Sequence, residues 1–347
     1  MRIAIVGAGS WGTALAHTLA LESGERDVVL CARTETVALV MTETRHNPRY
    51  LTEIALDADI RITADLPKAL DAAGVVVLAV PTAAMHEVAA RIKPHLVPGA
   101  VVVSAAKGFE EDTGRTMSAV LRDVLGPHGG NIAALSGPNI ALEIARGLPA
   151  AGVVAGDGGC AEVVRDAVTG SRYRAYSTDD TVGVEYAGAL KNIIAIAAGA
   201  CDGIGAGDNG KAAILTRGLA EIARLGLAAG ARMMTFAGLA GLGDCVVTCT
   251  SPHSRNRRLG EAIARGATLD EARERIGMVV EGVTTTHVAM QLAERHRVDM
   301  PITREVHAVL FEHKPVSLAF HDLMRRDPAE ELHGLAGSTR LDARPGE

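Results

Sequence analysis

The sequence predicts an α/β fold with an N-terminal doubly wound sheet and an all-α C-terminal domain. Three observations support this prediction. Short β-branched or apolar runs alternate with helical segments up to Tyr176, a glycine-rich turn follows the first run, and only helical periodicity continues after Thr181. We therefore expect a sheet-bearing domain over residues 1–180, an all-helical domain over residues 181–335 and a flexible tail over residues 336–347.

Length and charge limit the classes of protein to consider. A chain of 347 residues is longer than one hydrophobic core usually supports, which agrees with two domains. Lys and Arg total 35 against 41 Asp and Glu, so the net charge of −6 leaves no broad basic surface for nucleic acid. No apolar stretch of about 20 residues lacks a charge, and the first apolar run stops at Gly7, so we expect neither a membrane span nor a secretory signal.

The five cysteines are odd in number and lie in apolar surroundings, which favours reduced thiols in a cytoplasmic protein. Cys245 and Cys249 come shortly before His253, an arrangement that could suggest a metal site. Because no second cluster of ligands accompanies them, we favour buried thiols and expect no metal.

The first strand is expected over Arg2–Val6, and Gly7, Gly9 and Gly12 follow it directly before a helical segment. A GxGxxG sequence also occurs in ordinary turns, but a strand before it and a helix after it are the context that dinucleotide binding in a Rossmann domain requires. The first glycine permits the tight turn, the second lets the backbone approach a pyrophosphate, and the third lets helix and strand pack closely. Trp11 could cover the cofactor or close the hydrophobic core.

The second strand, expected over Asp27–Ala32, ends where such a domain reads the adenine ribose. A protein selective for NAD usually carries Asp or Glu there, whereas this chain has Ala32 followed by Arg33, so NADPH is favoured over NADH. Arg33 could instead be a solvated surface residue, and nearby Glu35 leaves the preference open.

Further strands are expected where apolar runs are bounded by turn residues, and their alternation with helices predicts a parallel sheet. These runs are Ile60–Ile62, Val75–Val80, Val101–Ala105, Ile132–Leu135, Val153–Ala155 and Tyr173–Tyr176. Ligands gather at the carboxyl ends of parallel strands, which makes Lys107, Gly137 and Asn139 candidates for a binding site. A solvated loop lysine is the alternative for Lys107.

A long apolar helix is expected over Val182–Ala200, with Lys191 in its middle. The helical neighbours of Lys191 offer no anion, so a buried ammonium would need a partner from elsewhere in the fold or from a ligand. The alternative is a lysine whose stem reaches along the helix to solvent. The residues alone leave both interpretations open.

A second polar cluster follows a glycine-rich turn in the helical half, at Asp244, Thr248 and Ser254–Arg258. Ser254 is a candidate N-cap for a helix through Ala264, so free amides, Arg255 and Asn256 would meet at one helix start and form a phosphate site. The charged residues could instead be a first turn that faces water. Further on, Glu281 could contact a cofactor or only mark the end of a helix.

Eight motifs in order resemble the family of bacterial NAD(P)-dependent sn-glycerol-3-phosphate dehydrogenases along nearly the whole chain. They are GAGSWGTALA, HNPRYL, AAKGFE, SGPNIALE, GALKNIIAIAAG, GLAGLGDCVVTCTS, SRNRRLG and VVEGVTT. The resemblance implies a Rossmann domain followed by a helical domain, a cytoplasmic homodimer, and NAD(P)H-dependent reduction of dihydroxyacetone phosphate to glycerol 3-phosphate for phospholipid synthesis.

The resemblance also implies roles for individual residues, with Lys191 as the catalytic lysine. It implies substrate contacts from Lys107, Gly137, Asp244, Ser254, Arg255 and Asn256. It implies cofactor contacts from Ser10, Trp11, Arg33, Lys107, Ala141, Arg255, Val279 and Glu281. The chain departs from the family pattern in two places: Asn139 and Ile140 stand where the family has Ser or Thr followed by Phe, and Cys245 stands where it has Leu.

We expect Lys191 to donate a proton to the carbonyl oxygen as hydride reaches C2, with Asp244 and Asn192 holding the amine. Arg255, Asn256 and the helix amides are expected to bind the phosphate, and Asn139 to replace a hydroxyl contact with an amide. The alternatives are another two-domain reductase that acts on a hydroxy acid or a sugar phosphate, and a non-catalytic NADPH-binding sensor.

Overall fold

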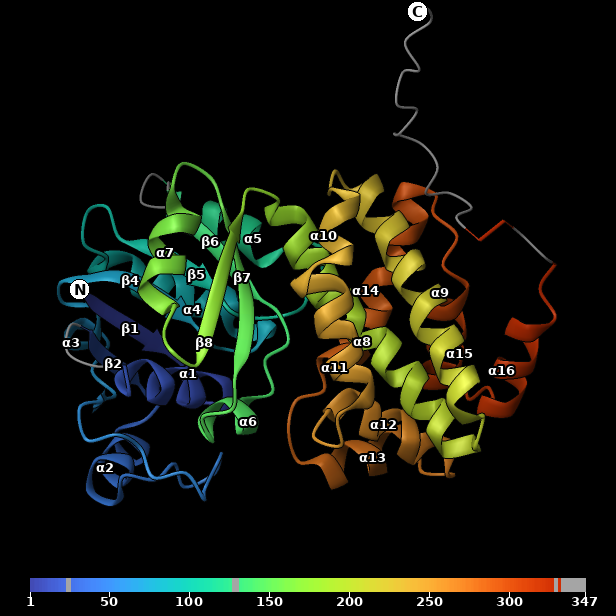
Figure 1. The fold of residues 1–347 in the computed structure, drawn as a ribbon, viewed down its shortest axis with the longest axis horizontal. Coiled ribbons are helices and arrows are strands. Elements are labelled where there is room, and N and C mark those ends of the chain that lie inside the picture. Colours follow the sequence, from blue (N-terminus) through green and yellow to red (C-terminus); the bar gives the residue numbers. More distant parts are fainter. Residues whose placement is uncertain (23–25, 127–130, 328–329, 332–347) are drawn as a thin grey trace, which may run out of the picture.

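The computed structural model describes residues 1–22, 26–126, 131–327 and 330–331, and the tail expected over 336–347 lies outside these residues. A sheet-bearing half and a helical half lie side by side, joined where β8 leads into α8 (Figure 1). This arrangement confirms the predicted fold class. The strands are β1 (Arg2–Val6), β2 (Asp27–Cys31), β3 (Arg61–Thr63), β4 (Ala73–Leu78), β5 (Val101–Ser104), β6 (Ile132–Ser136), β7 (Ala150–Gly156) and β8 (Tyr173–Thr178).

Helices cover both faces of the sheet, as the side-chain alternation along its strands requires. Ile3 and Ile5 of β1 pack in one apolar layer with α1 and α7, whereas Ala4 and Val6 pack in the other with α4 and α5. The helical segments of this half are α1 (Ser10–Ala20), α2 (Glu35–Thr44), α3 (Leu66–Leu70), η1 (Thr82–Ala84), α4 (Met85–Ile92), η2 (Lys93–His95), α5 (Met117–Leu125), α6 (Ala141–Ala145) and α7 (Cys160–Val168).

The sheet has the order β3-β2-β1-β4-β5-β6-β7-β8, and its strands run parallel as far as β6. The prediction of a parallel sheet is wrong at its far end, because β7 runs antiparallel to β6 and β8 runs parallel to β7. The cause is the connection between β6 and β7, which contains only the five-residue helix α6. A helix of about 7.5 Å is too short to carry the chain back along a strand of about 16 Å, so β7 starts at the edge where β6 ends.

The helical half is built around α8, which carries the long apolar run. It is buried along nearly its whole length and ends at Gly205, whose left-handed conformation closes the helix. The segments of this half are α8 (Thr181–Ile204), α9 (Gly207–Ala228), α10 (Met233–Ala237), the π-turn η4 (Leu239–Gly243), α11 (Asp244–Thr250), α12 (Arg255–Ala264), α13 (Leu269–Ile276), α14 (Glu281–His296), α15 (Pro301–Phe311) and α16 (Val316–Met324).

By length and composition α8 could also cross a membrane, with a mean hydropathy of 1.3 over its best window. However, 78% of that window is buried inside the protein, as in the core helix of a folded domain. Its apolar surface is therefore already covered by the surrounding helices and the sheet.

Two contacts fix α8 to the sheet half and to α12. Near its start, Glu185 accepts a hydrogen bond of 2.8 Å from the backbone nitrogen of Ser118 at the beginning of α5. Further along, a Cβ atom on Gly199 would lie 1.8 Å from the carbonyl oxygen of Arg257, and one on Gly260 would lie 1.9 Å from that of Ile196. Glycines on both helices therefore let α8 and α12 pack backbone to backbone.

Candidate active site

Lys191 lies in the middle of α8 with 5% of its surface exposed, so the interpretation of a lysine that reaches solvent is wrong. Its Nζ donates to Asp244 Oδ1 at 2.7 Å and to Thr248 Oγ1. Both partners lie on α11, one helical turn apart, and Asp244 is 1% exposed. The anion that the buried ammonium needed thus comes from a distant helix of the same domain.

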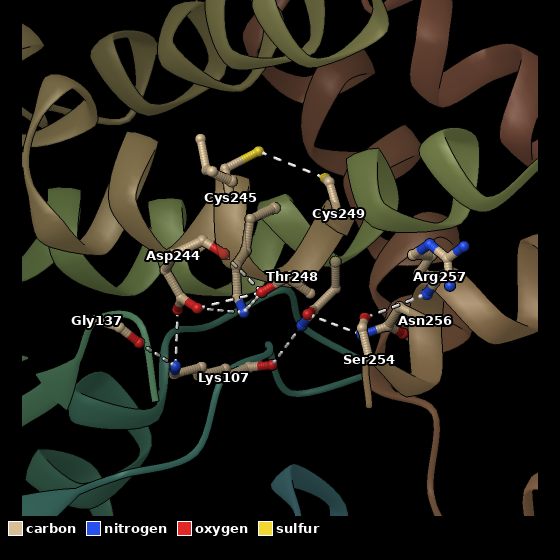
Figure 2. A network of polar contacts seen from close by, with 12 residues as sticks. Lys107, Gly137, Asp244, Cys245, Thr248, Cys249, Ser254, Asn256 and Arg257 are labelled. Carbon is tan, nitrogen blue, oxygen red and sulfur yellow. Dashed lines mark hydrogen bonds and ion pairs between the residues drawn. The ribbon is translucent and has the colours of Figure 1, made fainter. Parts of the chain in front are cut away.

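Lys107 approaches the same carboxylate from the sheet half, three residues after β5. Its Nζ donates to Asp244 Oδ2 at 2.7 Å and to the carbonyl oxygen of Gly137 at 2.8 Å (Figure 2). Only 20% of its side chain is exposed, so it is not a solvated loop lysine. One carboxylate therefore holds two ammonium groups, one from each domain.

The pKa of Lys107 is lowered to about 8 in this setting. Burial is the main cause, the ammonium of Lys191 lowers the pKa further, and the carboxylate of Asp244 opposes both. Near neutral pH this group lies close to the point where it gains or loses a proton.

Asn192 does not hold the amine of Lys191, contrary to the prediction. Its Nδ2 donates to the carbonyl oxygen of Lys107 at 3.4 Å, and its Oδ1 accepts from Asn256 Nδ2 at 2.9 Å. Consecutive residues of a helix point about 100° apart, so a neighbour of Lys191 faces other partners. Asn256 Oδ1 in turn accepts from Gly282 N at 3.0 Å, which links the Lys107 loop to α12 and α14.

The start of α12 has the expected cap. Ser254 is the N-cap, and its side chain accepts a hydrogen bond of 3.3 Å from the backbone nitrogen of Arg257. Two arginines of the first turn have different partners. Arg255 is exposed and donates to the carbonyl oxygen of Val279 at 2.6 Å, whereas Arg257 donates to Asp202 at 2.7 Å. Ser254 and Asn256 are buried beside the lysine cluster, as Figure 2 shows.

The glycine loop has the geometry that a dinucleotide needs. Gly7 has φ +113°, and a Cβ there would lie 2.6 Å from the carbonyl oxygen of Ala79. A Cβ on Gly12 would lie 2.0 Å from the carbonyl oxygen of Gly7, whereas one on Gly9 would meet no atom within 4 Å. Since Gly9 is also the N-cap of α1 and no side chain caps that helix, its first amides remain available to an anion that approaches across open space.

The other residues expected to contact a cofactor come from both halves of the molecule. Ser10 and Trp11 form the first turn of α1, Arg33 is exposed just after β2, and Ala141 begins α6. Val279 is 52% exposed, and Glu281 begins α14. Arg33 has no contact with the lysine cluster among the residues that the structure describes, and it lies where an adenine ribose would be read.

Glu281 connects the two domains, since its Oε2 accepts a hydrogen bond of 3.0 Å from Thr82 Oγ1. Burial raises the pKa of Glu281, and the contacts with Thr82 and Arg255 oppose this shift. Glu281 thus begins a helix and contacts the sheet half, whereas the sequence left open whether it marked only a helix end.

Gly137 and Asn139 form the turn after β6. Gly137 has φ +123°, and a Cβ there would lie 2.8 Å from Gly152 Cα, so only glycine fits while its carbonyl holds Lys107. Both polar atoms of the Asn139 amide are buried and have no hydrogen-bond partner in the described part of the chain. Among the described residues, this amide is the one candidate substrate contact with both polar atoms buried and unpaired.

Three residues of the site escaped the sequence-based reasoning: Thr248 as a partner of Lys191, Thr82, and Asn47. Asn47 Nδ2 donates to the carbonyl oxygen of Ala8 at 3.0 Å and to Thr13 Oγ1 at 2.9 Å. These two hydrogen bonds connect the HNPRYL segment to the glycine loop and to α1. The HNPRYL motif itself was the available signal for Asn47, but its contact lies 39 residues away in the chain.

All five cysteines are free and buried. Cys245 and Cys249 lie one turn apart on α11 with their sulfur atoms 3.9 Å apart (Figure 2). Within the described residues no group of three His, Cys, Asp or Glu side chains could hold a metal ion.

Comparison with known proteins gives matches along nearly the whole chain. A family model described as the N-terminus of NAD-dependent glycerol-3-phosphate dehydrogenase matches residues 2–158, and one described as its C-terminus matches residues 180–321. The glycerol-3-phosphate dehydrogenase (NAD(P)+) of Moorella thermoacetica is 49% identical over 332 residues, which cover 95% of this chain and 97% of that protein.

The enzyme of the same description from Pelotomaculum thermopropionicum is 48% identical over 337 residues, which cover 96% of each chain. Among solved structures, the glycerol-3-phosphate dehydrogenase of Coxiella burnetii is 37% identical with a TM-score of 0.87, over 94% of this chain and 99% of that one. The similarity in sequence and the similarity in fold therefore extend over both halves of the molecule.

Proposed function

Since this chain belongs to the family of NAD-dependent glycerol-3-phosphate dehydrogenases, we propose that it catalyses the reversible reduction of dihydroxyacetone phosphate to sn-glycerol 3-phosphate with NADPH or NADH. The observation that carries this proposal is the carboxylate of Asp244, which holds the amines of Lys107 and Lys191 at 2.7 Å each. A buried cluster with two ammonium groups suits a reaction in which negative charge develops on a carbonyl oxygen.

Lys191 is the proton donor in this proposal. A bound nicotinamide supplies the hydride that reduces C2 of the substrate. The ammonium of Lys191 stabilises the developing alkoxide and gives it a proton, and the neutral amine takes the hydroxyl proton in the reverse direction. Asp244 and Thr248 fix the amine in one orientation, because both accept hydrogen bonds from it.

The phosphate group is assigned to the start of α12. Ser254, Arg255 and Asn256 lie there together with the first amides of the helix, and Asn192 joins Asn256 to the backbone of Lys107. A dianion is attracted both by Arg255 and by the positive end of the helix dipole. Binding of the phosphate at this helix start holds C2 beside Lys191.

The residues of the glycine loop fit a dinucleotide, since Gly9 leaves open space in front of the amides of α1. Arg33 follows β2 and no carboxylate immediately precedes it, which favours NADPH over NADH. We further propose a cytoplasmic homodimer that supplies glycerol 3-phosphate for phospholipid synthesis, and light scattering of the purified protein tests the dimer.

The test is NADPH oxidation at 340 nm with dihydroxyacetone phosphate, beside NADH and beside unphosphorylated dihydroxyacetone. Wild-type protein should oxidise the cofactor only when the substrate carries phosphate. Lys191→Ala should lower kcat by a factor of about 10²–10⁴ with little change in NADPH affinity. Lys211→Ala is the matched control, because Lys211 is also largely buried and paired with an aspartate, Asp202, but lies outside the cluster.

Each alternative function predicts a different result. Oxidation that does not need the phosphate would favour another two-domain reductase, for example one that acts on a hydroxy acid. Tight NADPH binding without oxidation on any triose phosphate would favour a sensor. An active Lys191→Ala variant would reject the assignment of the proton donor.

A further inference from the structure

Three side chains near the carboxyl end of β6 carry buried polar atoms that have no hydrogen-bond partner among the described residues. The unpaired atoms are Ser136 Oγ, both amide atoms of Asn139 and the hydroxyl of Tyr173. Tyr173 is 1% exposed and Ser136 is 3% exposed. Because buried polar groups are nearly always paired, three unpaired ones in one place indicate a polar site that is completed by a ligand.

The reversal of β7 brings Tyr173 to this place. Tyr173 is the first residue of β8 and lies opposite Ala150, which begins β7 at the edge where β6 ends. A Cβ on Gly152 would lie 2.1 Å from the Tyr173 hydroxyl and 3.0 Å from the carbonyl oxygen of Ser136. The hydroxyl therefore lies over Gly152 and beside the turn that holds Lys107.

Tyr173 also contacts the glycine loop, which is expected to bind the cofactor. Its ring centroid lies 6.2 Å from that of Trp11 in the glycine loop, and the two rings are tilted by 48°. Burial raises the pKa of Tyr173, and the Asn139 side chain opposes the shift, so the hydroxyl keeps its proton and the amide lies close to it. The neutral hydroxyl therefore lies next to the Asn139 amide, whose nitrogen can donate to its oxygen.

We propose that Tyr173 is a positioning residue whose hydroxyl oxygen accepts a hydrogen bond from Asn139 Nδ2 and turns the amide oxygen toward the hydroxymethyl end of the substrate. This inference rests on the proposed function and names a further residue for the same reaction. The neutral groups of Ser136, Asn139 and Tyr173 suit an uncharged hydroxyl, whereas the cations at the start of α12 suit the phosphate. The two ends of the three-carbon substrate are thus distinguished by charge.

Ser136 completes this subsite on the side of α8. A Cβ on Gly188 would lie 2.7 Å from Ser136 Oγ and 3.7 Å from Lys107 Cγ. Gly188 lies one helical turn before Lys191, so the unpaired groups lie next to the lysine cluster rather than in a separate part of the core.

The test is Tyr173→Phe, which keeps the ring against Trp11 and removes only the hydroxyl. We expect KM for dihydroxyacetone phosphate to rise about three- to tenfold, because one hydrogen bond is lost, while KM for NADPH stays within about twofold. Asn139→Ala should raise the same KM at least as much. The decisive measurement is the double variant, in which loss of the hydroxyl should add no further effect.

Tyr186→Phe is the matched control, since Tyr186 is 6% exposed, packs edge to face on Phe109 and should leave KM unchanged. Melting temperatures of the four proteins of the cycle separate loss of folding from loss of positioning. The inference is overturned if Tyr173→Phe leaves KM for dihydroxyacetone phosphate unchanged, raises KM for NADPH instead, or has the same effect with and without Asn139. A wild-type protein without phosphate-dependent activity would instead reject the proposed function, and the inference with it.

Discussion

Replacing Asp244 with Asn tests whether one carboxylate holds both amines of the site. Each amine lies 2.7 Å from a carboxylate oxygen, and at an effective dielectric constant of about 20 such a pair is worth roughly 6 kcal/mol of Coulomb energy. Part of this energy offsets the cost of burying the charges, so removal of the anion should cost about 3–5 kcal/mol. An asparagine can accept from only one amine and presents N–H groups to the other.

Lys107 is the amine expected to lose its proton in Asp244→Asn. Its pKa is about 8 even with Asp244 present, and Asp244 is the group that raises it, so the variant pKa should lie below that value. At neutral pH the site would then lose a positive charge, and Lys191 would lose its orientation. We expect kcat/KM for dihydroxyacetone phosphate to fall at least about 100-fold and the melting temperature to fall as well.

The assay is NADPH oxidation with dihydroxyacetone phosphate, with thermal unfolding of the same samples. Asp202→Asn is the matched control, because Asp202 also joins two cations, Arg257 and Lys211, without touching the lysine cluster. It should lower stability while it leaves most of kcat/KM intact. An Asp244→Asn enzyme within about threefold of wild type, correctly folded, would refute the argument that this carboxylate organises the site.

Three further predictions follow from the same contacts. Since the pKa of Lys107 is about 8 in the folded protein and 10.5 in a free side chain, kcat/KM should fall as pH rises through 8. Between pH 8 and 10.5 the unfolded chain keeps a proton on Lys107 that the folded protein has lost, so the free energy of unfolding should rise with pH over this range. Lys107→Gln should lose both effects; a wild-type profile that stays flat from pH 7 to 9 would contradict the assignment. Gly12→Ala should lower the melting temperature, because its Cβ would lie 2.0 Å from a carbonyl oxygen. Gly9→Ala should fold normally and only weaken NADPH binding in titrations, because its Cβ would meet no atom within 4 Å. Equal melting temperatures for the two variants would disprove this distinction. Glu221→Ala should lower the free energy of unfolding by about 3 kcal/mol, because Glu221 accepts 2.8 Å hydrogen bonds from Ile302 N and Thr303 N at the start of α15. Denaturant unfolding measures this change, and an unchanged free energy would show that the start of α15 does not need the Glu221 carboxylate.

Local patterns were sufficient for the elements whose partners are close in the chain. The glycine loop lies between a strand and a helix as expected, and Ser254 caps α12 as its type and position predicted. The mismatch between an apolar helix and a central Lys191 left two interpretations open, and one of them, a buried ammonium paired with an anion from elsewhere in the fold, is the one the structure has. These features follow from side-chain volume, backbone freedom and the cost of burying charge at single positions.

Features that depend on distant contacts were not accessible in the same way. The direction of β7 depends on how the short α6 turns the chain, and the strand itself looks the same in either direction. Asn192 was assigned to the amine because it is adjacent to Lys191, but its partners come from residues 85 and 64 positions away. Thr248 lay in a polar cluster and Asn47 in a motif, but nothing local to either residue identified its partner.

The reversed pair β7 and β8 also determines which part of the molecule carries Lys191. Because β8 ends at the amino edge of the parallel strands, α8 starts there after only two residues and runs back along the sheet, past the end of β6 near Gly188. Its first turns are tied to α5 through Glu185, so the helix that carries Lys191 is anchored at its start to the sheet half. On the other side of the site, Glu281 at the start of α14 is hydrogen-bonded to Thr82. Both helices are thus held to the sheet half by a carboxylate near their start.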